Sequence, residues 1–247
     1  MERKKYFITL LLILFSFSVV NASHKSDIYK AYISNNMTLW QKVIDEMNLQ
    51  KIKSNELRLE LLNYQYGYIA WCIGNKKKES AEHYIQLGEA NIAVLEKLGH
   101  IPSLINSYKS AFYGYKIGLN KLKAPFIGPK SVDCAKLAIK QDDKNPYGYI
   151  QFGNSQYYMP SAFGGSKTEA LKYYIKAEKL LELNQNQLKE DWNYLSLLTM
   201  IAKAYTDLND YQHAKAYYTK ILNIEPNYLW VKNKLFPELL KKINQKV

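Results

Sequence analysis

The chain has 247 residues, including 34 Lys or Arg and 22 Asp or Glu, which give a formal net charge of +12 at pH 7. A chain of this length makes one domain of ordinary size or one short array of repeats. Its lysines mostly stand singly at helix-surface spacing rather than in the one-sided patch of a nucleic-acid-binding protein, so we expect no nucleic-acid partner. Contact with anionic lipid head groups or with an acidic protein surface stays open.

The N-terminal residues predict export. Basic residues near the start precede an uncharged run from Tyr6 to Val20, and small residues stand where a signal peptidase needs them for a cut after Ala22. An uncleaved anchor is the alternative, but a run of roughly 15 residues is short for a span of ~20. We predict a cleavable signal peptide at 1–22, a single helical repeat domain at 23–247, and a periplasmic or secreted product with no further transmembrane segment.

Helices are predicted throughout the rest of the chain, because strand signals are nearly absent and apolar residues recur at intervals of three and four. In chain order, the predicted elements are helix pairs at 27–34 with 38–47, 64–74 with 80–98 and 102–122 with 130–141, then fuller repeats at 146–183 and 195–228, and a terminal helix at 229–245. We predict an all-α, right-handed solenoid of about five antiparallel helix pairs. Its terminal helix, through Trp230 and Leu235 or Phe236, caps the last repeat.

The last repeat shows the pattern most fully. Ala202 on its first helix and Ala214 on its second are small enough to let the paired helices touch, while Tyr205 and Tyr218 fill the space beside the contact. Pro226 then ends the second helix, because proline lacks an amide donor and clashes with the preceding turn. This spacing resembles the tetratricopeptide repeat.

Three further stretches, taken in order, resemble a group of exported tetratricopeptide proteins of Bacteroidetes-type bacteria. They are Tyr113–Leu119, Lys123–Lys130 and Phe163–Lys167. Their order and spacing are more distantly similar to the helical periplasmic component associated with tripartite, TRAP-type transporters. The resemblance implies a non-catalytic protein that binds other proteins or a small apolar ligand, and it names no partner.

The turn inside the first of the two fuller repeats is longer than the repeat pattern needs. Its Gly164 and Gly165, followed by Ser166 and Lys167, invite comparison with a phosphate-binding loop. That loop follows a strand and has a longer Gly-x4-Gly-Lys-Ser/Thr pattern, and neither feature is present. We predict instead that the glycines turn the chain and that Ser166 and Glu169 form a capping box at the start of the next helix.

The repeat register also places a set of side chains on the concave side of the array, where such repeats receive extended peptides. With Gly153 in the small position of its helix, the candidate binding residues are Tyr147, Ile150, Asn154, Tyr157, Tyr158, Met200, Lys203 and Thr206. Tyrosine, of which the chain has 22, offers large contact area and a hydroxyl group for orientation. The alternative is that neighbouring helices or the cap fill this groove with the same rings.

A catalytic or metal-binding set is missing from the sequence. None of the four histidines lies four residues from another, and no nucleophile stands with a base and an orienting group. We expect no enzyme activity, no cofactor and no metal. Cys72 and Cys134 match no metal-ligand spacing, and we favour free buried thiols, with a disulfide as the alternative.

Two functions stay open. The leading interpretation is an exported scaffold that holds a protein or peptide segment on its concave, tyrosine-rich face. The alternative is a periplasmic binding protein, associated with a transporter, for a small apolar or amphipathic ligand enclosed where the first and last helices approach each other.

Overall fold

The computed structural model describes residues 24–245. The predicted signal peptide and its cut after Ala22 lie outside the described residues. The chain runs through an N-terminal helix at 24–34 and then through α2 (Met37–Leu49), α3 (Asn55–Gly74), α4 (Lys78–Lys97), α5 (Pro102–Leu119), α6 (Ala124–Gln141), α7 (Pro146–Tyr158), α8 (Lys167–Glu182), α9 (Trp192–Asp207), α10 (Tyr211–Ile224) and α11 (Phe236–Asn244). Between 24 and 245 there is no strand. None of the described helices is long and apolar enough to cross a membrane.

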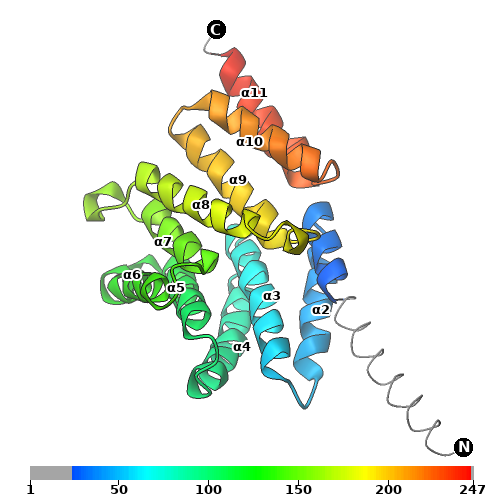
Figure 1. Cartoon of the computed structure of the whole chain (residues 1–247), viewed down its shortest axis with the longest axis vertical. Helices are drawn as coiled ribbons and strands as arrows, with labels where there is room; N and C mark the ends of the chain where they lie inside the picture. Colours follow the sequence, from blue (N-terminus) through cyan, green and yellow to red (C-terminus); the bar gives the residue numbers. More distant parts are fainter. Residues whose placement is uncertain (1–23, 246–247) are drawn as a thin grey trace, which may run out of the picture.

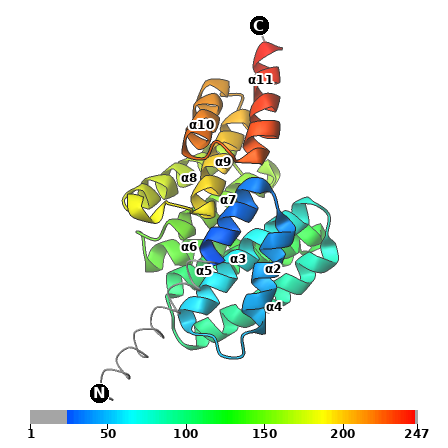
Figure 2. The same cartoon turned by 90° about the vertical axis from the view of Figure 1, so that its right-hand side faces the viewer.

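Consecutive helices pack as antiparallel pairs, and the pairs stack side by side (Figures 1 and 2). The described part of the chain contains five such pairs, from the N-terminal helix with α2 to α9 with α10, and α11 follows them. This arrangement confirms the predicted all-α array of about five pairs with a terminal helix.

Two helices begin well before their predicted starts. The first is α3, which begins at Asn55 because Ser54 caps it: the Ser54 hydroxyl accepts a hydrogen bond of 3.2 Å from the Leu57 amide. The second is α6, which begins at Ala124 and contains Pro129. Pro125 lies in the first turn of α6, where proline is tolerated because the amides there have no partner within the helix. Pro129 lies one turn later and removes a single hydrogen bond of the helix.

The array coils far enough for its first helix to touch its last pair, as Figure 1 shows beside the α8–α9 connection. The Tyr29 hydroxyl donates to Glu225 at 3.0 Å, and the rings of Tyr32 and Tyr228 lie 5.0 Å apart. Tyr29 and Tyr32 pack against both of the chain's apolar cores, one built mainly from the first three pairs and the other from the last two pairs and the cap. The first helix therefore contacts the connection that follows α10, at Glu225 and Tyr228, rather than the terminal helix α11.

Two glycines allow close contacts between helices that are distant in the sequence or paired in a repeat. A Cβ atom on Gly67 of α3 would lie 2.7 Å from the rings of Trp40 and Trp192, so this glycine lets α9 rest against α3. A Cβ atom on Gly153 would lie 2.6 Å from the ring of Tyr174. The prediction that Gly153 holds the small position of its repeat is confirmed.

The long turn between α7 and α8 is shaped by its glycines. Gly164 has a φ of +92°, and a Cβ atom on Gly165 would lie 1.8 Å from the Met159 carbonyl oxygen. The Ser166 hydroxyl accepts a hydrogen bond of 3.2 Å from the Glu169 amide, which is one half of the predicted capping box. The other half is wrong, because the Ser166 amide donates to the carbonyl oxygen of Gln156 at 3.0 Å.

The cap packs partly through the predicted residues, since Leu235 and Phe236 are half-buried and pack against the core of the last two pairs. Val231 and Leu239 are buried, whereas Trp230 is 39% exposed and Phe236 is half-buried against the ring of Tyr218. Trp230 lies just before a π-helical segment at Val231–Leu235, and its neighbour Val231 takes the buried position. The prediction that Trp230 covers the last repeat is wrong in this respect.

Candidate binding face on the inner helices

The first helices of successive pairs, α3, α5, α7 and α9, meet around Tyr66. The Tyr66 ring stacks on Tyr115 of α5 at 5.7 Å between centroids and contacts Tyr108 at 5.9 Å and Trp192 of α9 at 6.0 Å. Tyr108 and Trp192 are buried, while Tyr66 and Tyr115 are half-buried. Aromatic side chains from three helices thus form a continuous surface on this side of the array.

Polar side chains hold these rings in place. The Tyr115 hydroxyl donates to the carbonyl oxygen of Tyr66 at 3.0 Å, and the Gln151 amide of α7 donates to the Tyr66 hydroxyl at 3.1 Å. Asn154 donates to Gln151 at 3.0 Å and accepts from the Tyr174 hydroxyl at 2.8 Å. A fully hydrogen-bonded chain of this kind makes the surface rigid.

The surface continues to the end of α7 at Tyr158, whose side chain is 66% exposed. Its hydroxyl donates to the Met200 sulfur of α9 at 3.8 Å, and its ring meets the Tyr157 ring edge-on at 4.8 Å. Burial raises the pKa of Tyr66 above its ordinary value of 10. This phenol therefore stays protonated at neutral pH and is able to donate a hydrogen bond.

A carboxylate and two lysines lie beyond Met200. Asp207 accepts hydrogen bonds from the Tyr157 hydroxyl at 2.7 Å and from the Lys167 ammonium at 2.8 Å. Lys203 lies one turn before Asp207, with its nitrogen 5.7 Å from the centre of the Trp230 ring. Burial lowers the pKa of Lys203, and the charge of Asp207 opposes part of that shift.

The structure brings together three of the residues predicted for the concave face, Tyr158, Met200 and Lys203. We name these three with Tyr66 and Tyr115 the tyrosine face. Met200 and Lys203 are half-buried and three residues apart, on the same side of α9.

The other predicted residues are used within the fold. Ile150 is buried, and the half-buried Tyr147 lies 6.3 Å from Tyr108 between ring centres. Asn154 belongs to the chain of amides above, Tyr157 binds Asp207, and the Thr206 hydroxyl donates to the Ala202 carbonyl oxygen at 2.8 Å.

Sequence reasoning missed Tyr66, Tyr115 and Gln151. The repeat pattern decays in α3 and α5, so no register assigned a face to their tyrosines. The available signal was the clustering itself, since Tyr64, Tyr66 and Tyr68 alternate within one stretch of α3. In a helix, alternate residues point in different directions, so Tyr64 and Tyr68 are buried while Tyr66 is half-buried at the inner surface.

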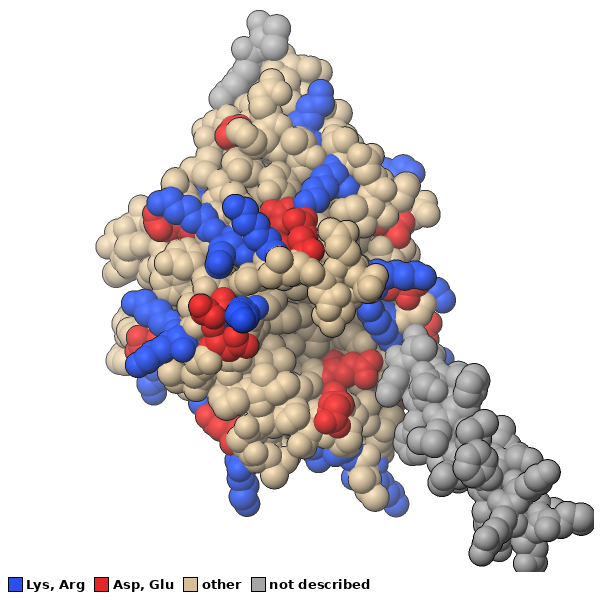
Figure 3. All heavy atoms as spheres, viewed as in Figure 1, with Lys and Arg blue, Asp and Glu red and all other residues tan. Residues whose placement is uncertain are grey.

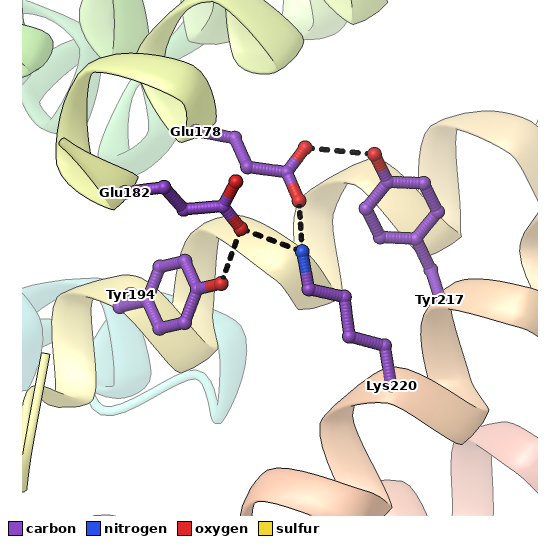
Figure 4. A network of polar contacts seen from close by, with 5 residues as sticks. All are labelled: Glu178, Glu182, Tyr194, Tyr217 and Lys220. Carbon is purple, nitrogen blue, oxygen red and sulfur yellow. Dashed lines mark hydrogen bonds and ion pairs between the residues drawn. The ribbon is translucent and has the colours of Figure 1, made fainter. Parts of the chain in front are cut away.

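The outer side of the array holds a separate charged network (Figure 4). Lys220 of α10 reaches across to α8, where its nitrogen lies 2.7 Å from both Glu178 and Glu182. Tyr217 donates to Glu178 and Tyr194 donates to Glu182, each at 2.7 Å. A hollow of about 780 Å³ beside this network opens broadly to solvent. Since Lys220 is already neutralised by two carboxylates, we place the candidate site on the tyrosine face.

Few groups with reactive chemistry stand near that face. The described residues include no cluster of three or more His, Cys, Asp or Glu side chains able to hold a metal ion. Cys72 and Cys134 are both free thiols, and burial raises the pKa of Cys72 to about 11. Cys72 is buried as predicted, whereas Cys134 is half-buried.

Comparison with known proteins agrees with this architecture. Residues 195–228 match the profile of the tetratricopeptide repeat family, which confirms the repeat predicted there. No curated protein sequence matches the chain. Among solved structures, the chain is similar to the HusA haemophore from Porphyromonas gingivalis, with a TM-score of 0.58 and 17% sequence identity over 75% of this chain and 93% of that chain. A likeness at this identity concerns the fold alone.

The fold is thus an all-α array of the tetratricopeptide type, an architecture that suits scaffold and binding proteins. The narrower resemblances, to exported Bacteroidetes-type proteins and to the transporter-associated component, stay predictions.

Proposed function

We propose that this chain is a non-catalytic binding protein whose tyrosine face holds a flat, amphipathic small molecule of the porphyrin class. The observation that carries the proposal is the convergence of half-buried and exposed phenol rings at the ends of α5 and α7, next to Met200 and Lys203. Rings and a thioether offer stacking contacts to a flat ligand. Lys203 offers a positive charge to the carboxylates at its edge.

The packing at the centre of the array favours a small ligand over a long peptide. Trp192 rests on α3 at Gly67, and its indole nitrogen donates to Asn63 at 3.0 Å. This contact fills the middle of the inner surface, so the exposed rings occupy only one end of it. The similarity to a structure named a haemophore supports the same ligand class.

Haemin and a metal-free porphyrin are the probes for this proposal. Each is titrated into the purified chain while the absorbance of the porphyrin and the fluorescence of the tryptophans are followed. Loss of one stacked ring costs about 1 kcal/mol, so Tyr158→Ala should weaken binding about fivefold. Tyr113→Ala is the matched control, because Tyr113 is a half-buried tyrosine of α5 whose ring contacts Lys116. Equal affinity for both variants, or no binding by the unaltered chain, would contradict the proposal.

A protein segment is the second candidate, favoured by the exposure of Tyr158 and by the matched tetratricopeptide repeat. If the chain is exported to the periplasm or secreted, as we propose, its partner would be a protein of the cell envelope. Capture from an envelope extract tests it: a partner retained by the unaltered chain and lost with Tyr158→Ala supports this candidate, and retention by both does not. N-terminal sequencing of the exported protein tests the proposed cut after Ala22.

A further inference from the structure

One edge of the array exposes large apolar side chains. Leu122 in the turn between α5 and α6 is 82% exposed, Phe126 in the first turn of α6 is 76% exposed, and Phe163 in the turn between α7 and α8 is 77% exposed. Apolar side chains this exposed to water are energetically unfavourable unless a partner covers them. We name Leu122, Phe126 and Phe163 the apolar edge.

Lysines flank the apolar edge without acidic partners. Lys121, Lys123 and Lys130 are exposed, and none of the three forms an ion pair with another residue in the described part of the chain. The sequence has no Asp or Glu between Glu96 and Asp133. Figure 3 shows basic and acidic side chains interspersed over much of the visible face. The edge therefore combines uncompensated positive charge with exposed apolar groups.

The two turns belong to neighbouring helix pairs and lie on the same edge of the array. In a stack of antiparallel pairs, every turn within a pair lies on one edge and every turn between pairs on the other. Lys78, at the start of α4, and Lys123 line the same hollow of about 320 Å³, so the α3–α4 and α5–α6 turns are adjacent. Figure 1 shows the α7–α8 turn projecting from the molecule, which leaves its tip free to meet a broad surface.

The opposite edge differs in charge although it also exposes apolar residues. Ile52 and Leu183, in turns between pairs, are 91% and 81% exposed. That edge also carries the acidic residues Asp142, Asp143 and Glu190. Ile52, however, stands between Lys51 and Lys53 in a turn without acidic residues, so only the turns at 142–145 and 183–191 of the opposite edge differ from the apolar edge in charge.

We propose that the apolar edge docks onto the surface of an anionic lipid bilayer, with Leu122, Phe126 and Phe163 entering the head-group region and Lys121, Lys123 and Lys130 contacting lipid phosphates. A projecting edge needs a surface that deforms around it, and a bilayer does so without a preformed groove. Basic residues are attracted to anionic leaflets, and aromatic rings are favoured at the depth of the head groups. The proposal is independent of the ligand bound at the tyrosine face.

Flotation with lipid vesicles tests the docking. The chain from Ser23 onward, which contains both apolar cores described above, is mixed with vesicles of phosphatidylcholine alone or with about one third phosphatidylglycerol. Each lysine near such a surface contributes about fivefold in affinity, so Lys121→Gln with Lys123→Gln and Lys130→Gln should together weaken binding about a hundredfold. Leu122→Ser with Phe126→Ser and Phe163→Ser should weaken it as well.

The matched control is Leu183→Ser, which removes an equally exposed apolar group from a turn of the opposite edge that carries acidic residues. Circular dichroism checks that each variant keeps its helices. Binding to the anionic vesicles that is lost in both edge variants and kept in the control supports the proposal. No binding by the unaltered chain, equal binding to neutral vesicles, or equal losses in edge and control variants would overturn it.

Discussion

Replacement of Lys220 by methionine tests the charged network between the last two pairs. The Glu178 side chain is 6% exposed, and its carboxylate is held by Lys220 and by the Tyr217 hydroxyl, each at 2.7 Å (Figure 4). Methionine preserves most of the length of the lysine side chain and removes the charge. Glu178 then keeps one donor, Tyr217, for a carboxylate that the fold shields from water.

The expected loss of stability follows from burial. Removal of one partner from a buried ion pair costs about 3–5 kcal/mol. The Lys220 side chain is 38% exposed, so solvent screens part of its interaction, and Tyr217 still serves Glu178. We therefore expect Lys220→Met to lower the free energy of unfolding by about 2–3 kcal/mol. Glu178→Gln removes the buried charge itself and should cost less, and the double variant should lose less than the sum of the two.

The network also makes a prediction about pH. Burial opposes ionisation of Glu182, but hydrogen bonds from Lys220 and Tyr194 outweigh it and hold the pKa of Glu182 below its ordinary value of 4.5. A carboxyl group with a lowered pKa in the folded state stabilises the fold above its unfolded pKa, and this contribution is lost as pH falls through the folded value. The contribution should be smaller in Lys220→Met. The free energy of unfolding of this variant should therefore fall less than that of the unaltered chain between about pH 5 and about pH 3, the range in which Glu182 titrates.

Urea unfolding followed by circular dichroism and by tryptophan fluorescence measures both effects. Two probes are needed because helical arrays do not always unfold in a single step. Lys215→Met is the control, because Lys215 is an exposed lysine on the same helix, and it should change stability by no more than about 0.5 kcal/mol. Our reasoning fails if Lys220→Met behaves like Lys215→Met.

Three further predictions concern the long turn and the tyrosine face. Gly165→Ala should destabilise the fold by about 1–3 kcal/mol because its Cβ atom meets the Met159 carbonyl oxygen, whereas Gly114→Ala, in open space within α5, should leave the melting temperature equal or higher; equal effects would contradict this account of the turn. Ser166→Ala should cost about 1 kcal/mol through loss of the helix cap, and unchanged melting would show that the cap contributes nothing. Burial lowers the pKa of Lys203 from 10.5, so Lys203 should lose its charge at a lower pH than an ordinary lysine does. As pH rises, affinity for a porphyrin with carboxylates should begin to fall at that lower pH. The same pH dependence of binding in Lys203→Met would exclude this role.

Local patterns were enough to predict the class of fold. Ala202 and Ala214 mark the contact of one helix pair, and Pro226 marks its end, because small residues and prolines act over a few neighbouring residues. Helix starts were less predictable. The helix predicted from residue 130 begins at Ala124 instead and includes Pro125 and Pro129, because the cost of a proline depends on whether its position already lacks a hydrogen-bond partner.

The residues of the candidate site also fall into a group that the sequence predicts and a group that it does not. Tyr158, Met200 and Lys203 follow from the register of the two well-formed repeats, and the structure brings them together. Tyr66 and Tyr115 come from helices whose repeat pattern is weak, and their contact with α7 and α9 depends on how far the array coils. The coil is set by close approaches such as Trp192 against Gly67, which join residues distant in the sequence.

The sequence by itself determined a helical array of paired helices, its terminal cap and the small residues at the centre of each fuller repeat, because these features depend on periodicity and on local sterics. The tertiary structure alone decided which tyrosines are buried in the cores, which meet at the inner surface and which turns project with uncompensated lysines. Those outcomes depend on the stacking of successive pairs, and a small rotation from pair to pair accumulates along the whole chain.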